Sequence, residues 1–194
     1  MEENQLNSPE RVVVIGGSAG SLEVILQLLP QLQDISSIAI VLIVHRRNTD
    51  DNVLEELLRM KSGLRVIEIE DKTAIQSGRV YVAPADYHLL FETNLTFSLD
   101  VSEKVHYSRP SIDVGFESAA DVFRNKLIAI LLSGANNDGT DGLLAVKDSE
   151  GVVIVQSPET AEVPFMPEYA LKHLTPDYVL SPNEMVAFIL SLVS

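Results

Sequence analysis

Two hydrophobic patterns alternate along the chain. Residues 38–44 and 127–132 are apolar at every position, which is typical of strands buried on both faces of a sheet. Residues 21–29 instead repeat apolar side chains at helical spacing and stop at Pro30. The same criteria predict further strands at 11–15, 64–69, 79–83 and 152–156, a hairpin at 89–99 that turns at Thr93 and Asn94, and helices at 52–60, at 111–124, over a stretch ending near Gly151, and at 183–193.

This alternation of strands and helices predicts the fold class. Elements of these lengths favour a three-layer αβα fold, with a doubly wound, mostly parallel sheet, helices on both faces and one short hairpin. No repeat or linker interrupts the pattern after residue 10. We therefore expect one domain over residues 11–194, preceded by a polar, disordered leader over residues 1–10.

Composition narrows the classes of function. The chain has 194 residues, of which 46% are hydrophobic and 22% charged, as in ordinary globular proteins. It has no cysteine, which excludes disulfides, thiolate metal sites and a cysteine nucleophile. The net charge of −14 argues against nucleic acid as a partner. No signal sequence opens the chain and the run at 38–44 is too short to span a bilayer, so we expect a cytoplasmic protein without membrane insertion.

Three polar residues follow predicted strands. Ser18 comes just after the first strand, His45 directly follows residues 38–44, and Asp138 lies beyond residues 127–132. The carboxyl ends of parallel strands meet at one edge of a sheet, where active sites form. A serine becomes a nucleophile when an imidazole accepts its proton and a carboxylate orients that imidazole. The pattern therefore predicts a Ser-His-Asp catalytic set, with the helix after Ser18 favouring developing negative charge.

Each of these residues also has a simpler structural interpretation. Ser18 can be the N-cap of its helix, and the Gly-x-Ser-x-Gly pattern around it often arises by chance. His45 can be a strand-end histidine, although Arg46 and Arg47 after it suggest an anionic ligand. Asp141 competes with Asp138, because both precede or open the same predicted helix.

Two other nucleotide- or ester-processing folds fit less well. A dinucleotide-binding loop needs Gly-x-Gly-x-x-Gly after the first strand, and here Ser18 occupies the position of the second glycine. An α/β-hydrolase has a mid-chain nucleophile and the order Ser, Asp, His. This chain has the order Ser, His, Asp, with the serine after its first strand.

Several motifs together resemble one known family. Residues 11–182 are similar to the catalytic domain of the CheB family of chemotaxis protein-glutamate methylesterases. Several motifs in one order are more specific than any single one. The matching segments are Ile-Gly-Gly-Ser-Ala-Gly at 15–20, Val-His at 44–45, Gly-Arg-Val-Tyr-Val-Ala-Pro at 78–84, Arg-Pro-Ser-Ile-Asp at 109–113, Leu-Leu-Ser-Gly-Ala-Asn-Asn-Asp-Gly at 131–139, Gln156 and Met-Pro at 166–167.

The resemblance implies a function and assigns roles. It implies hydrolysis of γ-glutamyl methyl esters on the cytoplasmic helices of chemoreceptors, and in some members deamidation of glutamines there. The family's nucleophile falls on Ser18, its histidine on His45 and its aspartate on Asp138, which makes Asp141 a helix-start acid. No metal and no organic cofactor are expected.

Four further residues complete the expected site. Backbone N–H groups near Ala19 and Ala135 are candidates for stabilising the oxyanion. Arg46 or Arg109, or the neighbouring Arg47, would steer an acidic receptor helix toward an acidic enzyme.

The sequence also departs from the family. Ala19 replaces the usual threonine after the serine, Ala135 and Asn136 alter a Gly-Met-Gly segment, and Phe165 alters a Gly-Met-Pro segment. The family usually carries a receiver domain before this one, whereas only ten residues precede the predicted domain here. We therefore expect a stand-alone catalytic domain, whose regulator would be a separate response-regulator protein. Two alternatives remain open: an esterase acting on another protein or small ester outside chemotaxis, and a non-catalytic module that binds receptor helices.

Overall fold

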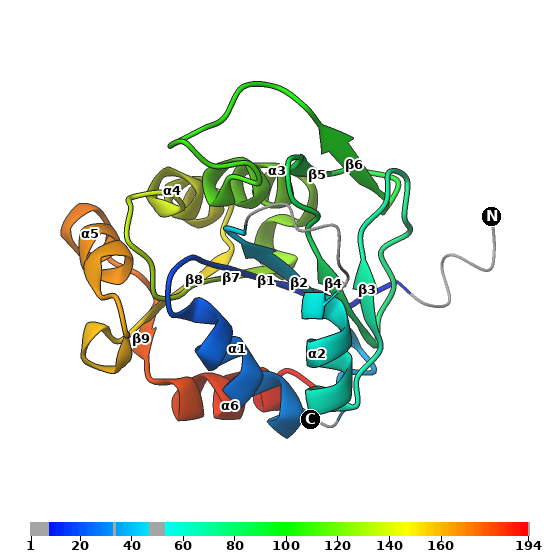
Figure 1. The fold of residues 1–194 in the computed structure, drawn as a ribbon, viewed down its shortest axis with the longest axis horizontal. Helices are drawn as coiled ribbons and strands as arrows, with labels where there is room; N and C mark the ends of the chain where they lie inside the picture. Colours follow the sequence, from blue (N-terminus) through cyan, green and yellow to red (C-terminus); the bar gives the residue numbers. More distant parts are fainter. Residues whose placement is uncertain (1–7, 33, 47–52, 194) are drawn as a thin grey trace.

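The centre of the molecule is a seven-stranded sheet in which every neighbouring pair of strands is parallel (Figure 1). The computed structural model describes residues 8–32, 34–46 and 53–193. The strand order is β3-β4-β2-β1-β7-β8-β9. The strands are β1 (Arg11–Gly17), β2 (Ile38–Val44), β3 (Val66–Glu68), β4 (Arg79–Val82), β7 (Leu127–Leu131), β8 (Val152–Gln156) and β9 (Tyr178–Leu180).

Helices cover both faces of this sheet, as Figure 1 shows. A separate antiparallel hairpin, β5 (His88–Phe91) with β6 (Phe97–Asp100), packs on the same side as α3. The helices of one face are α1 (Ser21–Leu28), α2 (Val53–Ser62) and α6 (Pro182–Ser191); those of the other are α3 (Ile112–Phe123), α4 (Thr140–Asp148) and α5 (Phe165–His173); short 3-10 turns lie at Leu29–Gln31, Arg124–Lys126 and Pro158–Thr160.

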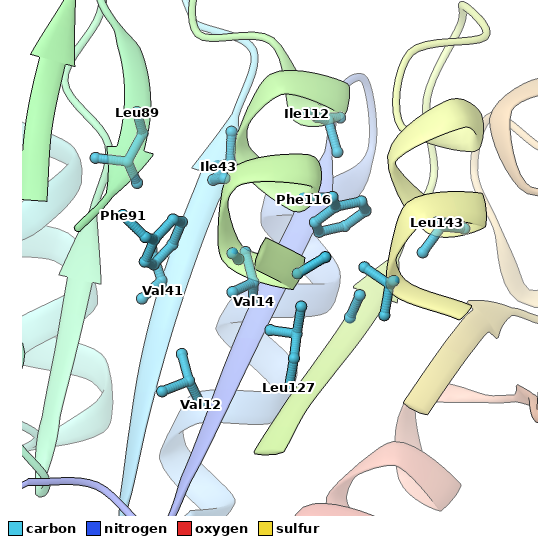
Figure 2. Close-up of a cluster of buried hydrophobic side chains, with 14 of the residues drawn as sticks. Val12, Val14, Val41, Ile43, Leu89, Phe91, Ile112, Phe116, Leu127 and Leu143 are labelled. Atoms are coloured by element: carbon cyan, nitrogen blue, oxygen red, sulfur yellow. The ribbon is translucent and has the colours of Figure 1, made fainter. Parts of the chain in front are cut away.

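Each face of the sheet has its own hydrophobic core. Successive side chains of a strand point to opposite faces, so Val12 and Val14 of β1 join the core under α3, while Val13 and Ile15 join the core under α1. Figure 2 shows Phe116 of α3 among side chains of the sheet and of α4. Continuous burial on both faces explains why these strands are apolar at every position.

Helix α3 packs unusually close to β1. A Cβ atom at Gly16 would lie only 2.4 Å from Ile112 Cγ2 and 3.1 Å from Phe116 Cζ. Gly16 therefore lets the first turn of α3 reach the carboxyl end of the sheet. This contact matters because the N-terminus of α3 holds one side of the site described below.

The carboxyl ends of β1 and β2 lie side by side. Gly17 is in register with Val44, and the N–H of His45 donates to the carbonyl oxygen of Gly17 at 3.1 Å. The residues that directly follow these strands, Ser18 and His45, are therefore held next to each other at the same edge of the sheet.

The observed elements confirm the predicted three-layer fold class, with differences in detail. Helix α5 and strand β9 were not predicted from the sequence. Residues 1–7 of the expected leader lie outside the described residues, whereas Pro9 is buried and the N–H of Glu10 donates to the carbonyl oxygen of Ser37 at 2.8 Å. Residues 9 and 10 therefore already pack against the fold, before β1 begins at Arg11. In the described part of the chain, no helix has the length and apolar character that crossing a membrane requires.

Candidate active site

Asp138 is a fully buried carboxylate that four donors surround. Its Oδ2 accepts hydrogen bonds from His45 Nε2 at 2.7 Å and from the N–H of Ile112 at 2.8 Å. Its Oδ1 accepts from Ser111 Oγ at 2.9 Å and from the N–H of Asp113 at 3.0 Å. Three of these donors belong to the start of α3, where N–H groups have no partner within the helix. The loop after β7 thus places Asp138 as an anion on a helix N-terminus.

These donors keep Asp138 ionised. Burial by itself would raise the pKa of this carboxyl group, but the hydrogen bonds from His45 and from the N–H groups of Asp113 and Ile112 outweigh burial and hold the pKa below its usual value. Asp138 therefore carries a negative charge that faces the His45 ring.

His45 lies between this carboxylate and a serine hydroxyl. Because Asp138 is ionised, His45 Nε2 carries the proton and Nδ1 is the free acceptor. Ser108 Oγ lies 3.3 Å from that Nδ1, and 3.4 Å from its alternative acceptor, the carbonyl oxygen of His106. The ring is oriented as a general base requires, because the Asp138 carboxylate holds one nitrogen and the other can accept a proton.

Ser18 has a firmly held backbone and a hydroxyl without a hydrogen bond. Its N–H donates to the carbonyl oxygen of Ser133 at 2.9 Å, and its own carbonyl oxygen accepts from Ser21 Oγ at 2.6 Å. Gly20, with a φ of 78°, then turns the chain into α1. Within the described residues, Ser18 Oγ has no hydrogen-bond partner. The structure therefore joins His45 to Asp138, and places Ser18 beside them without a bond to His45.

A buried polar pair supports the loop that carries Ser18. Ser133 Oγ donates to the carbonyl oxygen of Ala19 at 2.7 Å and accepts from the N–H of Val163 at 2.9 Å. The N–H of Ser133 donates to Gln156 Oε1 at 2.9 Å. Ser133 was not expected to have a role, and its only signal in the sequence is its place in the motif at residues 131–139. Together these residues tie the loops after β1, β7 and β8 to one another.

The expected oxyanion donors are available. Ala19 and Ala135 are both exposed, and in the described part of the chain neither N–H group has an acceptor. The segment before Ala135 is fixed, because the N–H of Gly134 donates to the carbonyl oxygen of Val163 at 3.1 Å and its carbonyl oxygen accepts from the N–H of Met166 at 3.0 Å. The N–H of Ala19 directly follows Ser18, and that of Ala135 lies two residues beyond Ser133, which accepts from the N–H of Ser18; both can donate to an oxygen that becomes negatively charged.

The two arginines of the expected site have protein partners. Arg46 Nη1 lies 2.8 Å from Glu55 Oε1, and its Nη2 donates to Glu68 Oε1 at 2.7 Å. Arg109 Nη1 donates to the carbonyl oxygens of Val101 and Ser102, both at 2.8 Å. Arg46 is therefore largely neutralised, and Arg109 braces a loop. Arg47 lies outside the described residues.

A cavity of about 370 Å³ opens at His45. Ser108 and Arg109 line it, together with Arg46 and Tyr107, whose side chain is 96% exposed. Asp141, the residue that competed with Asp138 on sequence pattern, is exposed in the first turn of α4. The cavity thus gives a substrate access to the imidazole that Asp138 orients.

Comparison with known proteins places this geometry in a family. A protein of Leptospira interrogans named for protein-glutamate methylesterase and protein-glutamine glutaminase activity is 42% identical over 180 residues, which cover 93% of each chain. The corresponding enzyme of Thermotoga maritima is 33% identical over 186 residues, which are 94% of this chain and 54% of that one.

A solved structure agrees with these relatives. The crystal structure of the Thermotoga maritima CheB methylesterase catalytic domain is 33% identical and superposes with a TM-score of 0.89, covering 94% of this chain and 98% of that one. The family model for CheB methylesterase matches residues 13–189. The resemblance inferred from the motifs is confirmed, and the chain belongs to the CheB methylesterase family.

Proposed function

We propose that this protein is a serine carboxylesterase that removes methyl groups from γ-glutamyl methyl esters on the cytoplasmic helices of chemoreceptors. The observation that carries the proposal is the 2.7 Å hydrogen bond between His45 and the buried Asp138, at the edge of the sheet where Ser18 follows β1. The activities for which the relatives are named support the substrate class.

The proposed reaction is acyl transfer through Ser18. Its hydroxyl rotates toward His45 Nδ1, transfers its proton there and attacks the ester carbonyl, while Asp138 stabilises the imidazolium that forms. The carbonyl oxygen, now negative, accepts hydrogen bonds from the free N–H groups of Ala19 and Ala135. Methanol leaves with the proton from His45. Water, deprotonated by the same ring, then releases the glutamate carboxylate.

Two serines compete for the role of nucleophile, and the surroundings favour Ser18. Ser108 is the hydroxyl nearer to His45 Nδ1, at 3.3 Å, but its own N–H already donates to the carbonyl oxygen of Val105. Ser18 instead precedes the free N–H of Ala19 at the start of α1, where an oxyanion can be stabilised. We therefore assign the nucleophile to Ser18.

The same groups suit a second substrate. A glutamine side chain presents a carbonyl of similar shape, from which ammonia leaves after protonation by His45. The relatives named as protein-glutamine glutaminases support this activity. An enzyme acting on cytoplasmic receptor helices works in the cytoplasm, and we propose a separate response-regulator protein as its regulator.

Methanol release from a methylated receptor fragment tests the proposal. Ser18→Ala should abolish release, because among the residues that the structure describes no other hydroxyl has both a base and free oxyanion donors, while the exposed Ser36→Ala control should retain it. Circular dichroism checks that both variants fold. Full activity of Ser18→Ala would overturn the serine mechanism.

Two further outcomes separate the alternatives. Hydrolysis of a generic nitrophenyl ester without release from the receptor fragment would assign the enzyme to another ester. Binding of the receptor helix by the unaltered chain, with no methanol release, would instead indicate a non-catalytic module.

A further inference from the structure

The segment between β6 and α3 borders the cavity that opens at His45. Residues 101–109, which we call the entrance loop, follow the last residue of β6 and lead to the N-terminus of α3. Figure 1 shows them as a long green loop that arches away from the sheet. Four residues of the entrance loop line the cavity together with His45, namely Lys104, Tyr107, Ser108 and Arg109. A large substrate that reaches the imidazole through this cavity therefore contacts the loop.

Hydrogen bonds inside the protein hold the entrance loop in place. Arg109 Nη1 donates to two carbonyl oxygens at the start of the loop. The carbonyl oxygen of Glu103 lies 2.8 Å from Nε2 of the buried His88. Because His88 Nδ1 accepts from the N–H of Ser111 at 3.1 Å, its Nε2 carries the proton and donates to Glu103. The loop is therefore preorganised, which lowers the entropy that binding a partner costs.

A tight turn places Tyr107 at the tip of the entrance loop. Val105 and Ser108 exchange both backbone hydrogen bonds, at 3.2 and 2.8 Å, so His106 and Tyr107 form a two-residue turn with φ values of 48° and 61°. His106 Nε2 lies 3.1 Å from Asp113 Oδ2, and this contact fastens the turn to α3. Turns of this kind favour Asn and Gly. The contact with Asp113 accounts for the histidine, whereas the turn gives no reason for the tyrosine.

Apolar side chains are exposed on the outer side of the entrance loop. The side chains of Val101 and Tyr107 are 66% and 96% exposed, so packing within the chain does not explain them. Tyr87, which is 39% exposed, lies beside the loop, because the N–H of its neighbour Asp86 donates to the carbonyl oxygen of Arg109 at 3.1 Å. Exposed aromatic and aliphatic groups gathered at the entrance of a site are suited to the apolar side of a partner.

The entrance loop also carries positive charge in an acidic molecule. Lys104 is exposed, and within the described part of the chain neither Lys104 nor Arg109 forms an ion pair with a carboxylate. The partners of Arg109 are neutral carbonyl oxygens. Glu103 on the loop and Asp86 in the cavity wall are the acidic residues nearby. Because the net charge of the chain is −14, an acidic helix needs such cations beside the cavity to approach it.

We propose that the outer side of the entrance loop, with Val101, Lys104 and Tyr107, is the docking surface for the receptor helix. This inference rests on the proposed function, because it takes the receptor helix as the substrate and adds the residues that recognise it. An amphipathic helix presents an apolar stripe with carboxylates beside it. Tyr107 and Val101 pack against the stripe, and Lys104 pairs with a carboxylate near the scissile ester. The cavity opens beside the loop, so a helix bound there presents its ester to His45.

Binding of a labelled, unmethylated helical fragment of a receptor, followed by fluorescence anisotropy, tests the proposal. The fragment carries no ester, so binding is measured whether or not the chain is an esterase. We expect Kd to rise roughly tenfold in Tyr107→Asn and roughly fivefold in Lys104→Gln. Asparagine tolerates the positive φ at position 107, so that variant should fold.

Three comparisons separate docking from a general effect on the protein. Tyr107→Phe keeps the ring and should bind as the unaltered chain does. The effect of Lys104→Gln should disappear at about 500 mM NaCl, because salt screens exposed charges, whereas the effect of Tyr107→Asn should persist. The exposed controls Met60→Gln, in the last turn of α2, and Lys126→Gln, just before β7, should leave Kd unchanged.

Other results would overturn the proposal. Unchanged Kd in both Tyr107→Asn and Lys104→Gln would do so, as would absence of binding by the unaltered chain. A dimer seen by sedimentation that Tyr107→Asn dissociates would assign the surface to a second copy of the chain instead. Loss of methanol release in Ser18→Ala, with both loop variants binding normally, would remove this inference and leave the proposed function standing.

Discussion

At the residue scale, the carboxylate of Asp138 stands out because both of its oxygens have their hydrogen bonds filled. Each of its oxygens accepts two hydrogen bonds, and three of the four donors belong to one helix start. These bonds fix the carboxylate, and the carboxylate in turn fixes the position of the His45 ring. The orientation of the imidazole is a consequence of the way α3 begins.

Replacing that carboxylate should disable the base. In Asp138→Asn one oxygen becomes an NH₂ group, which cannot accept from the N–H groups now bonded to it. His45 would then lose the acceptor that fixes its tautomer, and kcat should fall by roughly 10⁴-fold, as in other serine hydrolases. Methanol release from a methylated receptor fragment measures the fall, and a loss of less than about tenfold would contradict this role.

Ser108→Ala should have a smaller effect. Ser108 donates to the lone pair of His45 Nδ1 that Ser18 needs, so its hydroxyl positions the ring in the resting enzyme and must give way during the reaction. We expect kcat/KM to change by less than about tenfold, far less than in Ser18→Ala. If Ser108→Ala were inactive and Ser18→Ala active in the same assay, the two serines would have exchanged roles.

The sequence predicted part of this site for a physical reason. Ser18 and His45 directly follow apolar strands, so their place at one sheet edge could be inferred. The approach of Ser108 depends on a turn through His106 and Tyr107, which lacks the Asn-Gly signature of such turns. The partners of Arg46 come from α2 and β3, and nothing in the spacing of the chain indicates that they meet.

At the scale of elements, the buried strands were predicted well because their burial leaves a continuous apolar run. Helix α5 was missed because Pro167 falls in its first turn, where proline is tolerated but reads as a helix breaker. Strand β9 was missed because it has three residues, of which Tyr178 and Val179 are exposed at the sheet edge. Both elements depend on tertiary contacts more than on local pattern.

The start of α6 makes a prediction about pH. Glu184 Oε2 accepts from Ser181 Oγ at 2.6 Å and from the N–H of Ser181 at 2.8 Å. These bonds, the hydroxyl first, lower the pKa of Glu184 in the folded protein. Their stabilisation is therefore present above the unfolded-state pKa and is lost as pH falls through the lower folded-state pKa.

Urea unfolding of Glu184→Gln measures this contribution. The unaltered protein should have the higher free energy of unfolding near pH 7, and the difference should shrink as the pH falls toward about 3. Exposed Glu159→Gln is the control, for which no such trend is expected. A difference that does not depend on pH would show that the charge of Glu184 contributes nothing to α6.

At the scale of the whole molecule, the chain carries a large net negative charge. The chain has 28 acidic and 14 basic residues, and like charges repel across a compact surface. Salt screens that repulsion, so the midpoint of thermal unfolding should rise between about 10 mM and about 500 mM NaCl. Circular dichroism melting curves measure it, and a midpoint that falls with salt would mean that favourable ion pairs outweigh the net repulsion.

The alternation of elements also predicted the fold class but not the strand order. Apolar runs show that strands are central, yet they do not show which strands are neighbours. β1 pairs with β2 on one side and with β7 on the other, although more than a hundred residues separate it from β7. Helix α3 packs across both strands, and no local pattern in the sequence indicates that contact.

This central place of β1 bears on how the protein is made. Strand β1 is synthesised before β7 and cannot complete its pairing until Leu131 has been added, because β7 forms its second border. Pairings so distant in sequence slow folding, and a nascent chain keeps the flank of β1 open to wrong partners in the meantime. The His45–Asp138 pair therefore forms only after the loop with Asp138 has been synthesised and has reached the strands that were made before it.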